Sequence, residues 1–155
     1  VRKLFEFEIP EIYEGLIEIK SVSRDAGSRS KVGVMSVNGD IDAKGACVGN
    51  GGLRIKSINN ALEGEKIDIF VWNSDPKKLI AEALTPARVN SVEIDEKEKK
   101  ATVTVPNDQF SLAIGKGGQN TKLAAMAIGW KIDVHKQDEG FLEQIQSELE
   151  KYGVK

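Results

Sequence analysis

The chain has 155 residues, of which 40% are hydrophobic and 30% are charged, and its net charge is −2 at pH 7. This composition is typical of a soluble globular protein and excludes a disordered chain. No apolar run approaches the roughly 20 residues that a membrane-spanning helix needs, which excludes a protein built on such helices.

The cysteine count and the start of the chain suggest a compartment. A single cysteine excludes an internal disulfide and fits a reducing environment, so we expect a cytoplasmic protein. The first residues contain no apolar stretch typical of a signal peptide. The chain also lacks an initiator methionine, which suggests a fragment of a longer protein.

Charge is distributed unevenly along the chain. Residues 20–60 carry seven basic and three acidic side chains, whereas residues 1–19 carry two basic and five acidic ones. Residues 101–136 are also net positive, with four basic and two acidic side chains. Because the local field rather than the total charge steers a polyanion, these two basic segments are candidates for nucleic-acid binding. A scatter of charges over a solvated surface is the alternative.

The first half of the chain shows alternating helix and strand patterns. Apolar residues at helical spacing predict a first helix that Pro10 ends, and residues 24–30 predict the turn of a hairpin between two strands. The predicted elements, in chain order, are a helix over 1–9, strands over 15–22 and 31–37, helices over 42–48 and 52–62, and a strand over 67–72.

The second half repeats this order. Ser74-Asp75-Pro76 predicts a helix start, because a polar cap precedes a proline in the first turn. The predicted elements are a helix to about Leu84, strands over 89–94 and 101–105, helices over 107–114 and 118–128, and a strand over 131–135. Residues 138–152 then predict an amphipathic helix that packs back on the second half, binds a partner or self-associates. Its apolar stripe is Phe141, Leu142, Ile145 and Leu149.

A glycine-rich turn occurs in both halves, in matching surroundings. Gly49-Asn50-Gly51-Gly52 and Gly115-Lys116-Gly117-Gly118 are each followed by a predicted helix, a glycine and the tripeptide Lys-Ile-Asp. Glycine has no Cβ, so a ligand can approach the backbone closely, and free amides at a following helix start favour phosphate. The repeat therefore predicts one task, phosphate binding, performed twice.

The order of elements and the turns resemble the prokaryotic-type KH domain, an RNA-binding module. Two copies in succession resemble the tandem KH region of the NusA family of bacterial transcription factors. The resemblance covers residues 1–136 and is carried by the segments 8–15, 24–32, 45–49, 64–68, 112–120 and 129–133. It implies an α+β fold of two type II KH domains, each a three-stranded sheet packed by helices, plus a C-terminal helix. The implied boundaries are 1–73, 74–136 and 137–155.

The resemblance implies that each Gly-x-x-Gly loop clamps the backbone of single-stranded RNA while bases lie in an adjacent apolar groove. The candidate RNA contacts in the loops are Gly49, Asn50, Gly51, Gly52, Gly115, Lys116, Gly117 and Gly118. The candidate contacts around them are Arg24, Arg29, Lys31, Arg54, Lys56, Gln119, Asn120 and Lys122. For Arg24 and Arg29 a solvated turn is the alternative. The groove floors would include Val48 with Ile55 and Ile114 with Leu123, or these residues belong to the cores.

One feature departs from the family pattern. Family members usually carry a basic residue inside the first Gly-x-x-Gly loop, whereas this chain has Asn50 and Gly51 there. The first loop is therefore expected to be the weaker electrostatic grip, or to depend on basic residues nearby.

The resemblance implies an RNA-binding fragment of a transcription elongation, termination and antitermination factor that holds nascent single-stranded RNA. It implies no enzymatic activity, no cofactor and no metal, and contact with RNA polymerase through upstream domains that this chain lacks. We expect a monomer that does not bind membranes.

Two other functions remain open from the sequence. One is a ribosome-associated KH protein that binds ribosomal RNA during assembly. The other is a nucleotide-binding enzyme, although neither turn completes the Gly-x-x-x-x-Gly-Lys-Ser/Thr loop. Cys47 has no evident base, so we predict a buried thiol rather than a nucleophile, and one histidine with one cysteine argues against a zinc site.

Overall fold

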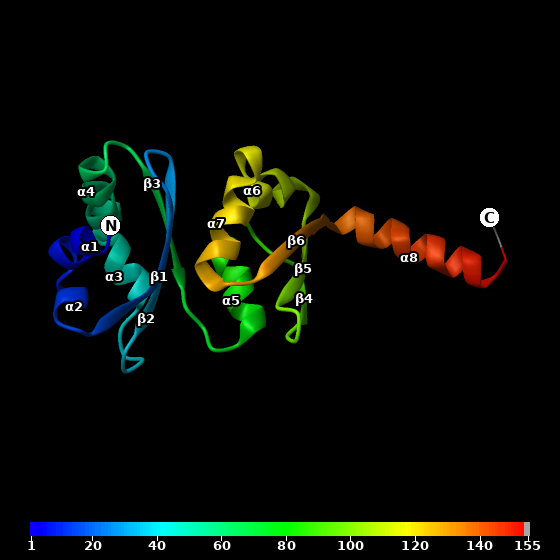
Figure 1. Ribbon diagram of the computed structural model, residues 1–155, viewed down its shortest axis with the longest axis horizontal. Helices are drawn as coiled ribbons and strands as arrows, with labels where there is room; N and C mark the ends of the chain where they lie inside the picture. The colour runs from blue at the N-terminus through cyan, green and yellow to red at the C-terminus, as the bar shows by residue number, and fades with distance from the viewer. Residues whose placement is uncertain (154–155) are drawn as a thin grey trace.

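The structure, a computed structural model, describes residues 1–153, except for the side chains of residues 139–144. It contains two three-stranded sheets of the same topology, each covered by helices, and a C-terminal helix (Figure 1). The predicted α+β class and the order helix, two strands, two helices, strand are confirmed in both halves. We refer to residues 1–73 as the first module and to residues 74–136 as the second module.

The first module follows the predicted order with longer hairpin strands. Its elements are α1 (Arg2–Glu8), α2 (Pro10–Tyr13), β1 (Ile17–Asp25), β2 (Arg29–Ser36), α3 (Ala43–Val48), the 3₁₀ turn η1 (Asn50–Gly52), α4 (Leu53–Ala61) and β3 (Lys66–Val71). The turn predicted over 24–30 is shorter, because strand pairing continues to the pair Asp25 and Arg29. Pro10 both ends α1 and starts α2, in the first-turn position where its missing amide costs nothing.

The second module repeats the first, and a final helix follows it. Its elements are α5 (Pro76–Ala83), β4 (Ser91–Asp95), β5 (Lys100–Val105), η2 (Asn107–Gln109), α6 (Phe110–Ile114), η3 (Lys116–Gly118), α7 (Gln119–Ile128) and β6 (Lys131–Lys136). The final helix is α8 (Gln137–Lys151). Asp75 caps α5, as predicted, by accepting a hydrogen bond from the amide of Lys77.

The sheet topology places each glycine turn inside a crossover. The central strand β2 pairs antiparallel with β1 and parallel with β3, and β5 pairs in the same way with β4 and β6. Parallel neighbours need a crossover connection, which α3 and α4 supply in the first module and α6 and α7 in the second. Each Gly-x-x-Gly loop is the corner between the two crossover helices.

The sheet of the first module is buried on both faces. Ile69 and Phe70 are consecutive on β3, so their side chains point to opposite faces. Ile69 belongs to the core that α1, α3 and α4 cover, whereas Phe70 belongs to the core of the second module. Figure 1 shows α5 and α7 on the opposite side of this sheet from α1, α3 and α4. Gly33 leaves room for this packing, because a Cβ there would lie 2.8 Å from the Phe70 ring.

Helix α8 extends away from the second module (Figure 1). Two residues of its predicted apolar stripe, Ile145 and Leu149, are 39% and 38% exposed, so this part of the stripe does not pack back on the second module. The other two, Phe141 and Leu142, lie outside the described side chains. No helix within the described residues combines the length and the apolar character that crossing a membrane requires.

The shared sheet makes Phe70 a test of the boundary between the modules. We expect Phe70→Ala to lower the free energy of unfolding by about 3–5 kcal/mol, because a fully buried ring is replaced by a cavity. Phe7→Ala is the matched control, since Phe7 is 83% exposed and its loss should change stability by less than about 0.5 kcal/mol. Urea unfolding measures both free energies, and equal effects of the two substitutions would contradict the placement of Phe70 in the core of the second module.

Candidate nucleic-acid interface

The two Gly-x-x-Gly loops have nearly the same backbone conformation. The φ and ψ angles are 78° and 170° at Gly49 and 78° and 168° at Gly115. They are 61° and 20° at Gly51 and 63° and 22° at Gly117. These positive φ values favour glycine, which adopts them without a steric penalty. The repeated sequence therefore produces one loop geometry twice.

The first glycine of each loop is required by close packing. A Cβ at Gly49 would lie 2.8 Å from Cγ of Arg54, and a Cβ at Gly115 would lie 2.7 Å from the backbone nitrogen of Asn120. Arg54 and Asn120 occupy equivalent positions, in the first turn of α4 and of α7. In each loop, a residue of the following helix therefore packs directly against the first glycine.

The middle of each loop is open. A Cβ at Gly51 or Gly117 would meet no atom within 4 Å. The amides of Gly52 and Gly118 donate to the carbonyls of Gly49 and Gly115 at 3.1 Å, which closes each turn. Each loop therefore presents its backbone at a surface that no side chain blocks, as the close approach of a phosphate backbone requires.

The basic side chain below the first loop is already paired. One Arg54 Nη donates to Glu11 Oε2 at 2.6 Å and to the Ala46 carbonyl at 2.8 Å. The carboxylate neutralises the guanidinium that sequence reasoning assigned to phosphate. Lys56, one turn into α4, is exposed and remains a candidate contact.

Lys31 is buried in the boundary between the modules, so the predicted RNA contact for Lys31 is wrong. Its Nζ donates to the Thr85 carbonyl at 2.6 Å and to Asp68 Oδ2 at 3.3 Å, and its side chain is fully buried. Burial lowers the pKa of Lys31 to about 8, although Asp68 opposes this shift. Arg29 is half-buried beside the same carboxylate, with its Nε 3.5 Å from Asp68 Oδ2.

Arg24 forms a bidentate ion pair with Glu65. Its Nε and Nη2 donate to Oε1 of Glu65 at 3.0 and 2.9 Å, and this fully buried carboxylate also accepts from the Gly27 amide and the Ser30 hydroxyl. Burial alone would raise the pKa of Glu65, but the hydrogen bonds from Arg24, Ser30 and Gly27 lower it to about 2. Sequence reasoning missed Glu65, because no local pattern indicates a partner in the hairpin.

The two polar residues after the second loop also bond to protein. Asn120 is fully buried and its Nδ2 donates to the carbonyls of Leu84 and Ala113, so the predicted RNA contact for Asn120 is wrong. The Gln119 side chain donates to the hairpin tip of the first module. Lys116 and Lys122 are exposed and remain candidate contacts.

A hollow of about 380 Å³ lies beside the second loop, at the boundary between the modules. Arg24 of the first module and Lys116 and Lys122 of the second line it, together with apolar Leu123 and Met126. Asp25 of the first module also lines the hollow and Arg24 is paired with Glu65, so its positive charge comes mainly from Lys116 and Lys122 of the second module.

Of the four aliphatic side chains proposed as groove floors, only Leu123 is buried, and Val48, Ile55 and Ile114 are half-buried. Leu123 is 3% exposed. Val48 and Ile55 pack against the core of the first module, and Ile114 packs against the core of the second. These three side chains therefore lie at the edges of the cores, where they also reach the surface.

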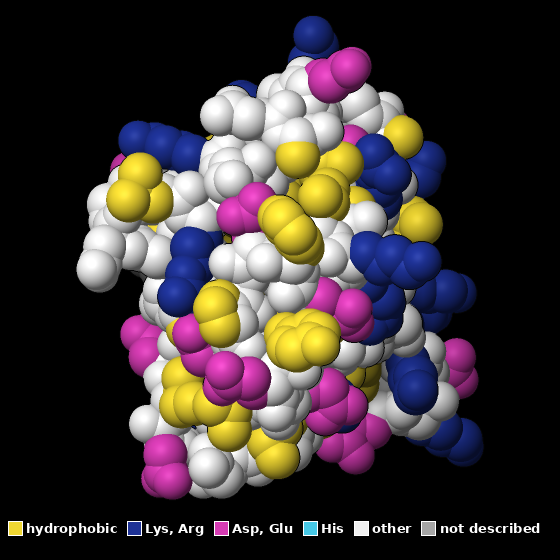
Figure 2. Space-filling model, turned by 90° about the vertical axis from the view of Figure 1, so that its left-hand side faces the viewer, with side chains coloured by type: hydrophobic (Ala, Val, Ile, Leu, Met, Phe, Trp, Pro, Cys, Tyr) yellow, Lys and Arg dark blue, Asp and Glu magenta, His cyan; other side chains and the backbone are white. Residues whose placement is uncertain are grey.

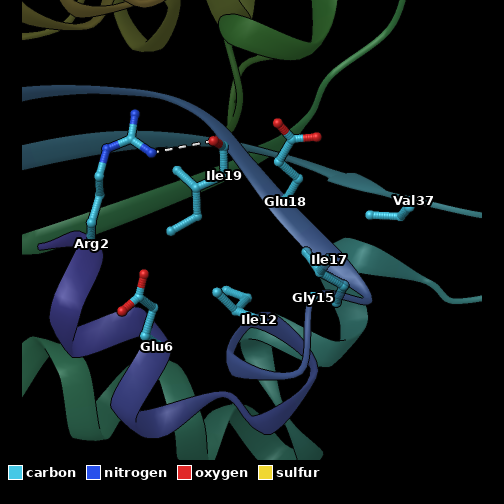
Figure 3. A pocket seen from close by; sticks show the side chains of 8 residues that line it. All are labelled: Arg2, Glu6, Ile12, Gly15, Ile17, Glu18, Ile19 and Val37. Atoms are coloured by element: carbon cyan, nitrogen blue, oxygen red, sulfur yellow. Dashed lines mark hydrogen bonds between the residues drawn. The ribbon is translucent and has the colours of Figure 1, made fainter.

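Another hollow, of about 450 Å³, lies between α1, α2 and β1, away from both loops (Figure 3). The isoleucines Ile12, Ile17 and Ile19 line it. Glu6 and Glu18 bring two carboxylates, and its one cation, Arg2, donates to the Ile19 carbonyl at 3.2 Å. This balance of charge disfavours a phosphate ligand.

The end of the first module carries a mixed surface. Figure 2 shows hydrophobic and acidic side chains interspersed on this face, with Lys and Arg gathered mainly along one edge. The exposed large hydrophobic residues of the first module are Phe7, Tyr13, Met35, Val37 and Leu53. A polyanion is therefore steered to the edge of this face rather than to its centre.

Cys47 lies in the first core and is fully buried, which confirms the predicted buried thiol. Burial, with a smaller effect of Glu11, raises the pKa of Cys47 to about 12. The thiol stays protonated at neutral pH and is therefore a poor nucleophile.

The Glu65 carboxylate makes the stability of the first module depend on pH. Its pKa falls from the ordinary 4.5 to about 2 on folding, so its stabilising effect is complete above pH 4.5 and is lost as the pH falls toward 2. We expect Glu65→Gln to destabilise the protein most at neutral pH and progressively less below pH 4.5. Urea unfolding at pH 7, 4 and 3 measures the difference from wild type, and a constant difference would contradict the assignment.

Comparisons with known proteins agree with this geometry. The NusA-like first KH domain matches residues 1–72, and the NusA-like second KH domain matches residues 76–140. A solved structure, "Crystal structure of APE1850", has a TM-score of 0.56 and 23% identity, and the match covers 83% of this chain and 96% of that one. At this identity it supports the fold alone.

Several relatives share the name "Transcription termination/antitermination protein NusA". The Bacillus subtilis protein is 53% identical over 137 residues, covering 88% of this chain and 37% of the relative. The Mycobacterium tuberculosis protein is 51% identical, with coverage of 86% and 39%, and the Thermus thermophilus protein is 49% identical, with coverage of 87% and 34%. The chain thus spans little more than a third of these relatives. It belongs to the family of NusA-like tandem KH domains.

Proposed function

We propose that this chain is the RNA-binding part of a transcription elongation, termination and antitermination factor, and that it holds nascent single-stranded RNA. The observation that carries the proposal is the pair of matching open loops, at whose central glycines a Cβ would meet no atom within 4 Å. The names of the relatives supply the process, and KH modules bind single-stranded RNA through such loops.

Each loop holds the strand by its backbone. Phosphate oxygens accept hydrogen bonds from the amides of Asn50 and Gly51 in the first loop and of Lys116 and Gly117 in the second. The following helices add the positive end of their dipoles. In the second loop the Lys116 side chain adds a positive charge, so this loop is the stronger electrostatic grip.

The role is binding rather than catalysis. The chain acts as a cytoplasmic monomer, without a cofactor, and RNA polymerase is contacted through parts of the longer relatives that this chain does not span. The protonated thiol of Cys47 supports a non-catalytic role. Isothermal titration with ATP and GTP should give no heat.

The central glycines allow a direct test with a matched control. Gly51→Asp with Gly117→Asp places carboxylates where phosphates approach, and we expect it to weaken RNA binding at least about tenfold. Gly51→Asn with Gly117→Asn has the same shape and tolerates positive φ equally well, but it adds no charge. Fluorescence anisotropy with a labelled single-stranded RNA measures both, and circular dichroism checks folding. If the Asp variant kept wild-type affinity, the loops would not be the RNA site.

The salt dependence of binding tests the role of Lys116. Each phosphate neutralised on a single strand contributes about −0.7 to the slope of log K against log salt concentration. We expect Lys116→Ala to reduce the slope by about that amount. Lys97→Ala removes an exposed charge in the β4–β5 turn and should leave the slope unchanged. Equal slopes for Lys116→Ala and wild type would show that Lys116 does not contact phosphate.

A further inference from the structure

The hairpin tip of the first module lies against the helix that begins directly after the second loop. Gln119 is the first residue of α7, next to Gly118. Its Nε2 donates to Asp25 Oδ2 at 2.8 Å and to Ser28 Oγ at 2.7 Å. An amide nitrogen carries two hydrogens, so both bonds form together. The end of the second loop is thus tied to residues 94 and 91 positions earlier in the chain.

The tip to which Gln119 bonds is itself fixed. The buried Glu65 carboxylate accepts from the Gly27 amide at 2.8 Å and from the Arg24 guanidinium at 2.9 Å. These donors flank Asp25 and precede Ser28 in the turn. The acceptors for Gln119 therefore stand in set positions before any ligand arrives.

A second contact fixes the same helix one turn further on. The Ser23 hydroxyl, on β1, donates to the Leu123 carbonyl at 2.7 Å, and this bond is buried. Two anchors one turn apart on α7 hold both its position and its rotation relative to the hairpin. Because the second Gly-x-x-Gly loop leads directly into α7, the position of the loop relative to the hairpin is fixed as well.

The first loop lacks the equivalent anchor. Leu53 holds the position that Gln119 holds in the second module, and it is 69% exposed. Within residues 1–153, the side chain that closes the first loop, Arg54, bonds to Glu11 and Ala46 of its own module. The two modules are therefore not equivalent. In the described part of the chain, the first loop is held only by contacts within its own module, whereas the second loop is also held by the hairpin tip of the other module.

We propose that Gln119 is a positioning residue, through which the hairpin tip of the first module holds the second Gly-x-x-Gly loop in its phosphate-binding conformation. This rests on the RNA-binding function proposed above. Three of the four loop residues are glycines with positive φ, and glycine loses more conformational freedom on being fixed than any other residue. A loop that is fixed before RNA binds avoids that entropic cost on binding. The affinity of the second loop thus depends on Asp25 and Ser28 of the other module.

Asp25 provides the sharpest test, because charge and positioning predict opposite results there. Asp25 lines the same hollow as Lys116, so removing its charge should strengthen RNA binding if electrostatics alone matter. Asp25→Ala also removes one of the two acceptors for Gln119 and leaves only Ser28 Oγ, and we expect it to weaken binding about three- to tenfold. Asp25→Asn removes the charge but keeps an oxygen acceptor, and it should bind at least as tightly as wild type.

The coupling to Gln119 is measured by a double-mutant cycle. We expect Gln119→Ala, which removes both hydrogen bonds, to weaken binding at least as much as Asp25→Ala, and the double variant to bind no more weakly than Gln119→Ala alone. Fluorescence anisotropy at fixed salt gives the affinities, and thermal melts verify that each variant is folded. Without RNA, ¹⁵N relaxation should show lower order parameters at Lys116 and Gly117 in Asp25→Ala than in Asp25→Asn.

The outcomes separate the two proposals. If Asp25→Ala binds RNA as tightly as wild type while the double Asp variant of Gly51 and Gly117 has lost binding, the positioning role is refuted and the RNA-binding function stands. If wild type binds no RNA, the RNA-binding function fails. In that case unchanged order parameters at Lys116 and Gly117 in Asp25→Ala would refute the positioning role independently.

Discussion

The arrangement of both loops depends on the packing of one sheet on both of its faces. A three-stranded sheet with one solvated face would leave the two modules joined only by the residues between β3 and α5. Here Phe70 and Trp72 lie in or against the core of the second module, and Gly33 leaves the space that the Phe70 ring fills. Moving one module relative to the other would expose these rings to water. The packing therefore holds the two modules, with the loops that they carry, in one relative arrangement.

Local patterns were sufficient to predict the loops and the order of elements. The positive φ of a glycine turn and the periodicity of a helix are properties of a few consecutive residues. The sequence was therefore enough to place Gly51 and Gly117 in turns between two helices. The fate of Lys31 could not be assigned in this way. The β2 strand reads as part of a hairpin with one solvated face, but the second module covers that face and binds Lys31 through Thr85. Such a contact joins residues 54 positions apart and leaves no local signal.

The repeat predicted the conformation of the two loops correctly, but it was misleading about the roles of the residues that follow them. Arg54 and Asn120 occupy the same position, and each packs against the first glycine of its loop. Their residue types suggested phosphate ligands, yet the position is a packing position in both copies. The half-buried guanidinium of Arg54 donates to the Glu11 carboxylate, and the buried amide of Asn120 donates to the Leu84 carbonyl. Both copies therefore place a side chain against the first loop glycine, but the hydrogen-bond partner of that side chain differs between them.

These assignments change how a chain with a net charge of −2 can bind a polyanion. With Lys31 buried and Arg54 paired to Glu11, the exposed lysines beside the loops are Lys56, Lys116 and Lys122. Three such charges provide only a small share of counterion release, so electrostatics alone gives weak binding. In the proposed function, the remaining affinity comes from backbone amides and contacts with bases. Both depend on geometry more than on charge, because an amide binds phosphate only at hydrogen-bonding distance. For the proposed RNA binding, the packed boundary between the modules therefore does by geometry what a larger positive charge would otherwise do.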